Sequence, residues 1–291
     1  GPAQQAAAYF AIEDWQNAQD SFQAWLGAGK ISASLRARAE LLVAVCEESL
    51  GHYAEAAQSY EKVLTALPVL ADFVHLHAAR SLFFAGDLAR ASEHTRAVSA
   101  DSILAIERAL LDGDLLRAGG KWAEAEKLYN DFLERRPGHA QALFYLAEAR
   151  EALGKAVPHA LKLYRKLVIE HPLDGWAAKA GARYQALLKK VPKKAREAYT
   201  QLSAAELITR GNVYFEAMRN PEAEADFAAA LAGPLDPEKE CVVRFQRAQS
   251  VFKQRQRASS ESFFQAAAIA CKKSGNQDLA ARSLYQNGRG L

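Results

Sequence analysis

Two stretches of the chain rewrite one another: GHYAEAAQSYEKVLTALP at residues 51–68 and GKWAEAEKLYNDFLERRP at residues 120–137. Both carry glycine, an aromatic residue, alanine, tyrosine and proline at the same five places. A motif that recurs at such a distance indicates an array of repeated units rather than one ordinary domain. The recurrence therefore says more about architecture than about chemistry.

All copies of the motif align on one small residue. Its equivalents are Ala18, Ala56, Ala91, Ala125, Ala160, Ala223 and Ser260, at intervals of 38, 35, 34, 35, 63 and 37 residues. Four residues later each copy has an aromatic residue, except for one threonine: Phe22, Tyr60, Thr95, Tyr129, Tyr164, Phe227 and Phe264. A proline follows eight residues after that in three copies, at Pro68, Pro137 and Pro172. This spacing resembles the tetratricopeptide repeat, in which each unit is a pair of antiparallel helices.

Packing gives each recurring residue type a reason. An alanine lets the second helix of a pair approach the first closely, and an aromatic residue four positions later lies on the same helix face. Gly51, Gly86, Gly120 and Gly154 stand between the expected helices, where a helix can end in the left-handed conformation that glycine adopts at little cost. Because one pair cannot bury its apolar face alone, we expect the pairs to stack into an all-α superhelical solenoid.

The interval of 63 residues marks an interruption in the array. It exceeds the preceding interval of 35 by 28 residues (63 − 35), enough for one unpaired helix at about 174–189 and a basic loop, KKVPKKAR, at 189–196. We therefore expect an N-terminal sub-array at 1–188, a basic linker at 189–201 and a C-terminal sub-array at 202–291. The last stretch, from Asp278, begins a first helix without its partner, so it is either an edge left by truncation or a helix that caps the array.

Composition excludes several function classes. The net charge of +3 is too small to indicate nucleic-acid binding, although residues from Lys189 onward carry 17 basic and 11 acidic side chains, or +6. No apolar run is long enough to span a membrane. The seven histidines are scattered, and Cys46, Cys241 and Cys271 lie within helical patterns without a CxxC pair. We expect no metal and no cofactor, and the sequence does not decide whether Cys241 and Cys271 are paired.

A narrower family resemblance rests on three segments: ALPVLAD at 66–72, LSAAELITRGNVYFEAMRNPEAEADFAAAL at 202–231 and ARSLYQNGRG at 281–290. In a helical array, these look like the N-terminal superhelical part of bacterial soluble lytic transglycosylases. The resemblance implies a periplasmic protein whose solenoid precedes a lysozyme-like domain that cleaves peptidoglycan. The expected partners are then the attached catalytic domain and peptidoglycan glycan strands. The alternative is a free-standing adaptor, periplasmic or cytoplasmic, that binds a partner protein or peptide.

The chain itself shows no recognisable catalytic site. The transglycosylase domain carries a Glu-Ser pair and a later Gly-Leu-Met-Gln stretch, and its glutamate is the general acid and base. Glu261 and Ser262 form such a pair, but they fall at the packing positions of the seventh repeat, and the single methionine, Met218, lies upstream. No GxSxG, HExxH or phosphate-binding glycine motif is present. We therefore expect a noncatalytic scaffold.

The first helices of the pairs are expected to line the concave face and to supply any binding surface. The residues at equivalent positions of these first helices form a column along the array. The column is strongly apolar, which fits either packing against neighbouring helices or an apolar groove for a partner. A basic run, KQRQR, suggests a second surface on which a missing catalytic domain could dock. The partner-binding candidates are Phe73, Leu76, Arg80, Phe84, Leu110, Phe144, Glu148, Asn212, Phe215, Phe245 and Gln249, and the docking candidates are Lys253, Arg255 and Arg257.

Overall fold

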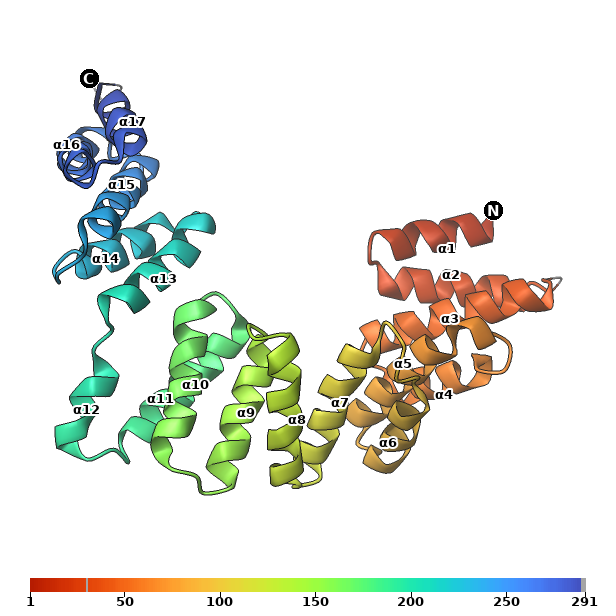
Figure 1. The fold of residues 1–291 in the computed structure, drawn as a ribbon. Helices are drawn as coiled ribbons and strands as arrows, with labels where there is room; N and C mark the ends of the chain where they lie inside the picture. The colour runs from red at the N-terminus through yellow and green to blue at the C-terminus, as the bar shows by residue number, and fades with distance from the viewer. Residues whose placement is uncertain (30, 289–291) are drawn as a thin grey trace. The chain divides into compact units, whose positions relative to one another are not determined.

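The computed structural model describes residues 1–29 and 31–288, and these ranges contain helices and turns but no strand. The chain divides into two compact units, Gly1–Pro137 and Gly138–Leu291. The expected all-α fold of paired helices is therefore confirmed (Figure 1). Within the described ranges, no helix is both long enough and apolar enough to cross a membrane.

The first unit consists of four consecutive helix pairs. In each pair the two helices pack against one another, as Figure 1 shows for α1 with α2. A short 3-10 turn at Pro68–Leu70 leads from the second pair into the third. The helices are α1 Pro2–Ala11, α2 Trp15–Gly27, α3 Ala33–Ser49, α4 Tyr53–Val63, α5 Ala71–Ala85, α6 Leu88–Ala97, α7 Ala105–Ala118 and α8 Trp122–Arg135.

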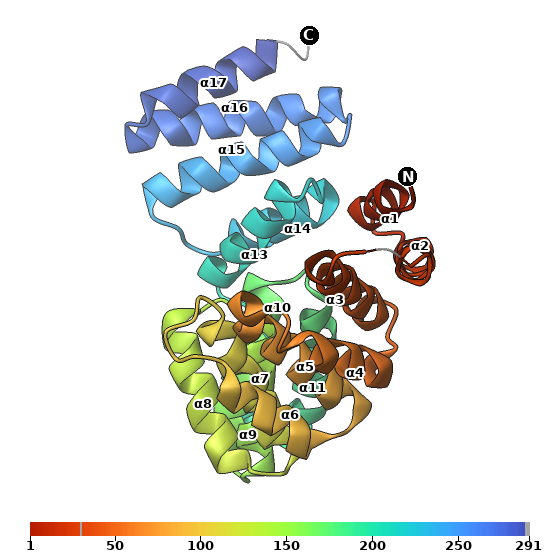
Figure 2. The same cartoon turned by 90° about the vertical axis from the view of Figure 1, so that its right-hand side faces the viewer.

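The second unit has three pairs, an interruption after the first pair, and a final single helix. The pairs are α9 with α10, α13 with α14 and α15 with α16, and α17 packs on α16 (Figure 2). The helices are α9 Ala140–Ala152, α10 Val157–Glu170, α11 Gly175–Leu188, α12 Lys193–Thr200, α13 Ala204–Glu216, α14 Asn220–Ala230, α15 Pro237–Lys253, α16 Arg257–Ser274 and α17 Gln277–Gly288.

The repeat register predicted from the sequence is confirmed by burial. All seven small residues, from Ala18 to Ser260, lie on the second helix of a pair and are at most 2% exposed. The residues four positions later, from Phe22 to Phe264, are at most 3% exposed. The glycines predicted to separate the helices have φ values between 65° and 89°, and Gly86 forms the left-handed C-cap of α5.

Two further glycines make room for the packing rings. A Cβ added at Gly113 would lie 2.7 Å from Cε1 of Tyr129, and one added at Gly211 would lie 2.8 Å from Cε1 of Phe227. Both glycines are on the first helix of a pair, opposite the aromatic residue of the second helix. Helix propensity alone would favour alanine at both positions, so close packing of the pair decides the residue.

The interruption differs in part from the sequence prediction. The single helix expected at about 174–189 is α11, whereas the segment 189–201, expected to be a basic linker, contains the helix α12. Lysine, alanine, arginine and glutamate are good helix formers, and Pro192 lies at the N-cap, before the helix interior, where its missing N–H removes no helical hydrogen bond. The basic segment therefore folds locally although α12 buries none of its residues. The predicted division at 188 concerns repeat register, which the two compact units do not test.

Candidate partner-binding clefts

Several residues of the predicted concave column lie in the core. Leu76, Phe144 and Phe245 are 1%, 8% and 7% exposed. Phe144 packs against the rings of Tyr164 and Trp176, at centroid distances of 5.5 and 5.2 Å. The prediction that these three residues bind a partner is corrected, because their side chains stabilise the contact between neighbouring helices and offer no surface to a ligand.

The other column candidates of the first unit are partly or fully exposed. Phe84 is 56% exposed and stacks on Tyr53 with the ring centroids 4.9 Å apart. Phe73 lies against the ring of His77 at 4.1 Å, and Arg80 Nη1 is 3.7 Å from Glu48 Oε1. Leu110 is half-buried on α7. The column therefore does not form one continuous apolar groove in this unit.

Glu48 is the centre of a polar cluster within the first unit. Tyr60 donates to Glu48 Oε2 at 2.7 Å, and His77 Nδ1 lies 2.7 Å from the same oxygen. Burial alone would raise the pKa of the Glu48 carboxyl, but the hydrogen bonds and charges of His77, Tyr60 and Arg80 outweigh it and lower that pKa. Similar pairs occur in two other repeats, from Tyr129 to Asp114 and from Tyr164 to Glu151. Such a recurring pair acts in packing, since it ties the second helix of a repeat to its first.

The basic candidates at the end of α15 are on the surface. Lys253, Arg255 and Arg257 are exposed, and the Lys253 ammonium lies 3.9 Å above the ring of Phe215. Gln249 is half-buried on α15, and Glu148 is half-buried on α9. The docking role of the three basic residues stays a prediction.

A cleft of the second unit lies between α13 and α15, and we call it the α13–α15 cleft. Its volume is about 860 Å³. Ile208, Val242 and Leu235 supply apolar surface, and Asn212 and Gln246 supply two side-chain amides. Gln246 Nε2 donates to Asn212 Oδ1 at 2.9 Å, while Gln246 Oε1 is buried without a hydrogen-bond partner in the described part of the chain. Apolar walls with a few polar groups are typical of a ligand-binding cleft.

A second cleft, the α10–α13 cleft, lies at the interruption. Its volume is about 610 Å³. Arg150 of α9, together with His159, Lys162 and Lys166 of α10, lines one side, and the first turn of α13 lines the other. Ala205 and Thr209 line both clefts, so the two meet across the first turns of α13. A continuous surface thus runs from α10 past α13 to α15.

Arg165 lines the α10–α13 cleft and fixes α13 against α10. Its Nε and Nη2 atoms donate to Oε1 and Oε2 of Glu206, each at 2.6 Å. The same guanidinium donates to the carbonyl oxygens of Tyr199 at 2.7 Å and Gln201 at 2.6 Å. The hydrogen bonds from Arg165, and next those within the helix cap at Ser203, lower the pKa of Glu206 to about 2 despite its partial burial.

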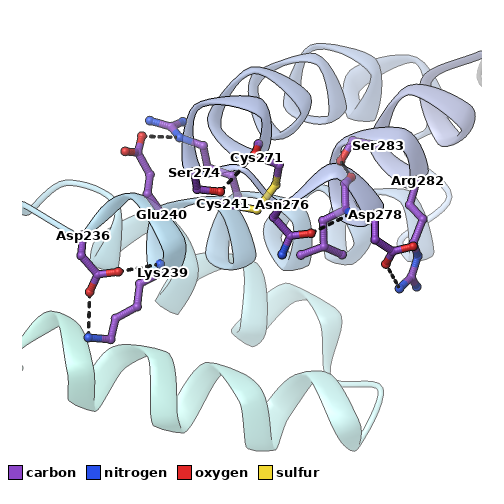
Figure 3. Close-up of a disulfide and its surroundings, with 12 residues drawn as sticks. Asp236, Lys239, Glu240, Cys241, Cys271, Ser274, Asn276, Asp278, Arg282 and Ser283 are labelled. Atoms are coloured by element: carbon purple, nitrogen blue, oxygen red, sulfur yellow. Dashed lines mark hydrogen bonds and ion pairs between the residues drawn. A yellow bond between two sulfur atoms is a disulfide. The ribbon is translucent and has the colours of Figure 1, made fainter.

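A disulfide joins the last helix pair. Cys241 of α15 and Cys271 of α16 are bonded (Figure 3). Both are fully buried, and Ala280 of α17 packs on them. In the loop that follows α16, Asn276 Oδ1 accepts a hydrogen bond from the Leu279 backbone N–H at 3.0 Å. The disulfide therefore holds together α15 and α16, the pair against which α17 packs. Cys46 is a buried free thiol, whose burial raises its pKa to about 11.

The Glu-Ser pair noted in the sequence lies within a helix, and the described residues form no metal-binding group. The Glu261–Ser262 pair lies on α16, where Ser262 donates to the Ser259 carbonyl oxygen at 3.3 Å. The ranges 1–29 and 31–288 hold no group of three or more histidine, cysteine or acidic side chains arranged to bind a metal ion.

Apart from Asn212, the residues that build the clefts were not predicted from the sequence. Arg165, Lys162 and Val242 belong to no repeat position that the alignment singled out, and only the long interval between Ala160 and Ala223 pointed to this region. Of the predicted partner-binding residues, Asn212 lies in the α13–α15 cleft. The interruption was the available signal, because irregular segments of a repeat array are where new surfaces can form.

A family model and one solved structure support the repeat fold. The tetratricopeptide repeat family model matches residues 4–71 and 110–175. A solved tetratricopeptide repeat protein from Parabacteroides merdae aligns with a TM-score of 0.52 and 16% identity, over 86% of this chain and 97% of that chain. The structure of Naa15/Naa10 bound to HypK-THB aligns with a TM-score of 0.48 and 14% identity, over 97% of this chain and 51% of that one. A search of curated proteins found no match.

Proposed function

We propose that this tetratricopeptide-like chain is a noncatalytic interaction scaffold that holds an extended segment of a partner protein in the α13–α15 cleft. The observation that carries the proposal is the combination of apolar walls, at Ile208 and Val242, with the amide pair of Asn212 and Gln246. An extended peptide offers apolar side chains and main-chain donors and acceptors in alternation. Both kinds of group have a counterpart in the cleft.

A peptide selection tests this proposal directly. Random peptides displayed on phage are panned against the purified chain, and the enriched sequences are synthesised and titrated by fluorescence anisotropy. Val242→Lys places a charge in the cleft at a side chain that is already 36% exposed, so the fold should tolerate it. The matched control is Ile269→Lys on α16, where the isoleucine is 71% exposed and outside the cleft.

We expect the enriched peptides to bind the wild-type chain and the Ile269→Lys variant alike, and to lose affinity by about tenfold or more on Val242→Lys, because a charge in an apolar site costs on the order of 1.4 kcal/mol or more. Failure to enrich any sequence, or binding that ignores the Val242 change, would remove the proposal.

A second candidate function is that the chain forms the superhelical arm of a periplasmic lytic transglycosylase. The alternative to this arm is a free-standing adaptor. The buried Cys241–Cys271 disulfide favours an oxidising compartment such as the periplasm over the cytoplasm. In the arm reading, Lys253, Arg255 and Arg257 would contact an attached catalytic domain. The compartment can be tested by quenching intact cells in acid and then treating the denatured protein with a thiol reagent. In a cytoplasmic chain Cys241 and Cys271 would be reduced and would react.

A further inference from the structure

The α10–α13 cleft carries an excess of positive charge. Its lining includes four basic side chains, Arg150, Lys162, Arg165 and Lys166, and two carboxylates, Glu170 and Glu206, which leaves a net charge of +2 (4 − 2). His159, Lys162 and Lys166 are spaced by three and four residues, so they share one face of α10. Lys162 is exposed, and no ion pair of this lysine is found among the described residues.

The interruption of the array builds this surface. α11 packs on α10, as the helix after a regular pair would, and after the intervening α12 the first turn of α13 also reaches α10 through Glu206. The guanidinium of Arg165 is ion-paired with Glu206 and donates to two carbonyl oxygens, and these contacts fix α13 against α10. The charge of Lys162 is therefore available at the rim of a cleft whose walls are held in place.

The basic α10–α13 cleft and the mainly apolar α13–α15 cleft meet at Ala205 and Thr209. The charge of the joined surface changes along its length. It is basic beside α10 and apolar with amide groups at Ile208 and Asn212. At the start of α15, Asp236, Glu238 and Lys239 line it with a net charge of −1 (1 − 2), and Lys239 is ion-paired with Asp236 at 2.8 Å. A uniform polyanion would meet carboxylates at that far end. A peptide with acidic residues at one end and apolar residues at the other would match the surface throughout.

We propose that the α10–α13 cleft binds the acidic residues of a peptide whose apolar residues occupy the α13–α15 cleft. This inference rests on the proposed function and names the partner chemistry: an extended polypeptide segment with consecutive aspartate or glutamate residues next to apolar ones. Lys162 contacts the carboxylates directly, and Arg165 positions the two walls without contacting the peptide.

Two labelled peptide pools provide the test. The first has glutamate in one half and randomised apolar residues in the other, and the second replaces every glutamate with glutamine. Both are titrated against the wild-type chain, Lys162→Glu, and the control Lys272→Glu, which makes the same charge change at an exposed lysine of α16. A mixed-sequence single-stranded DNA oligonucleotide serves as a probe for general anion binding.

We expect the glutamate pool to bind the wild-type chain more tightly than the glutamine pool, and Lys162→Glu to weaken the glutamate pool by about tenfold at low salt while leaving the glutamine pool and the control unchanged. Equal effects of the Lys162 and Lys272 changes would overturn the inference, as would DNA binding that depends on Lys162. If the pools bind and respond to Val242→Lys but not to Lys162→Glu, this inference fails and the proposed function stands. If neither pool binds, both fail.

Discussion

Arg165 and Glu206 form a bidentate ion pair across the interruption of the repeat array, with both N···O distances at 2.6 Å. Arg165 is on the second helix before the interruption, and Glu206 is on the first helix after it. Glu206 also accepts from the backbone N–H and the hydroxyl of Ser203, which caps α13. One pair of side chains thus sets both the start of a helix and its contact with α10.

The first prediction concerns the stability that this pair supplies. Arg165→Met retains most of the side-chain length but removes the donors to Glu206, Tyr199 and Gln201. Because the two side chains are 16% and 29% exposed, we expect the free energy of unfolding to fall by about 2 kcal/mol. The control is Arg183→Met, since Arg183 pairs with Glu151 but is 48% exposed and should cost at most about 1 kcal/mol. Equal losses in urea denaturation would show that the junction pair has no special weight.

The second prediction is the pH dependence of the same junction. The folded-state pKa of Glu206 is lowered from 4.5 to about 2, so its contribution is fully present above pH 4.5 and is lost as the pH falls toward 2. Relative to wild type, Glu206→Gln should be destabilised at neutral pH, and the difference should shrink through that window. Urea denaturation at several pH values measures it, and a difference that stays constant from neutral pH to pH 2 would contradict the assignment.

The repeat architecture could be predicted because packing imposes it on every copy. The small residue at Ala125 and the ring at Tyr129 have buried counterparts in nearly every helix pair, with Thr95 in place of one ring, so they leave a period in the sequence. Burial follows directly from that period. The same logic explains why the apolar column was ambiguous: Phe144 is apolar because it is core, and a partner-binding phenylalanine would look the same in the sequence.

The candidate clefts could not be predicted because they depend on single long-range contacts. Arg165 and Glu206 are 41 residues apart, and the sequence around each residue contains no motif that predicts the pair. The disulfide is similar, since Cys241 and Cys271 come together only when α15 and α16 are packed in register. Such contacts occur once in the chain and leave no pattern to read.

The third prediction tests the close packing at Gly211. An alanine there would place its Cβ 2.8 Å from Phe227 Cε1 and 3.3 Å from Asp226 Cβ. The ring is fully buried and cannot move away freely, so we expect Gly211→Ala to destabilise the chain by about 1–3 kcal/mol despite the better helix propensity of alanine. Gly175→Ala is the control, because nothing lies within 4 Å of an added Cβ at that position. Thermal unfolding should separate the two variants, and a Gly211→Ala chain as stable as the control would mean that α13 can shift.

The last prediction concerns the Cys241–Cys271 disulfide. The bond closes a loop with a sequence separation of 30 residues, for which the chain-entropy model gives a stabilisation of about 3–4 kcal/mol. Reduction should therefore lower the stability of the second unit and speed hydrogen exchange in α15–α17, since α17 packs on the bonded pair through Ala280. The variant with Cys241→Ala and Cys271→Ala should behave like the reduced wild type and should not respond to reductant. Cys46 provides an internal control, because its buried thiol, with a pKa raised to about 11, should be alkylated only when the first unit unfolds. If mass spectrometry of the oxidised protein finds three reactive thiols after denaturation, the disulfide is absent and this prediction fails.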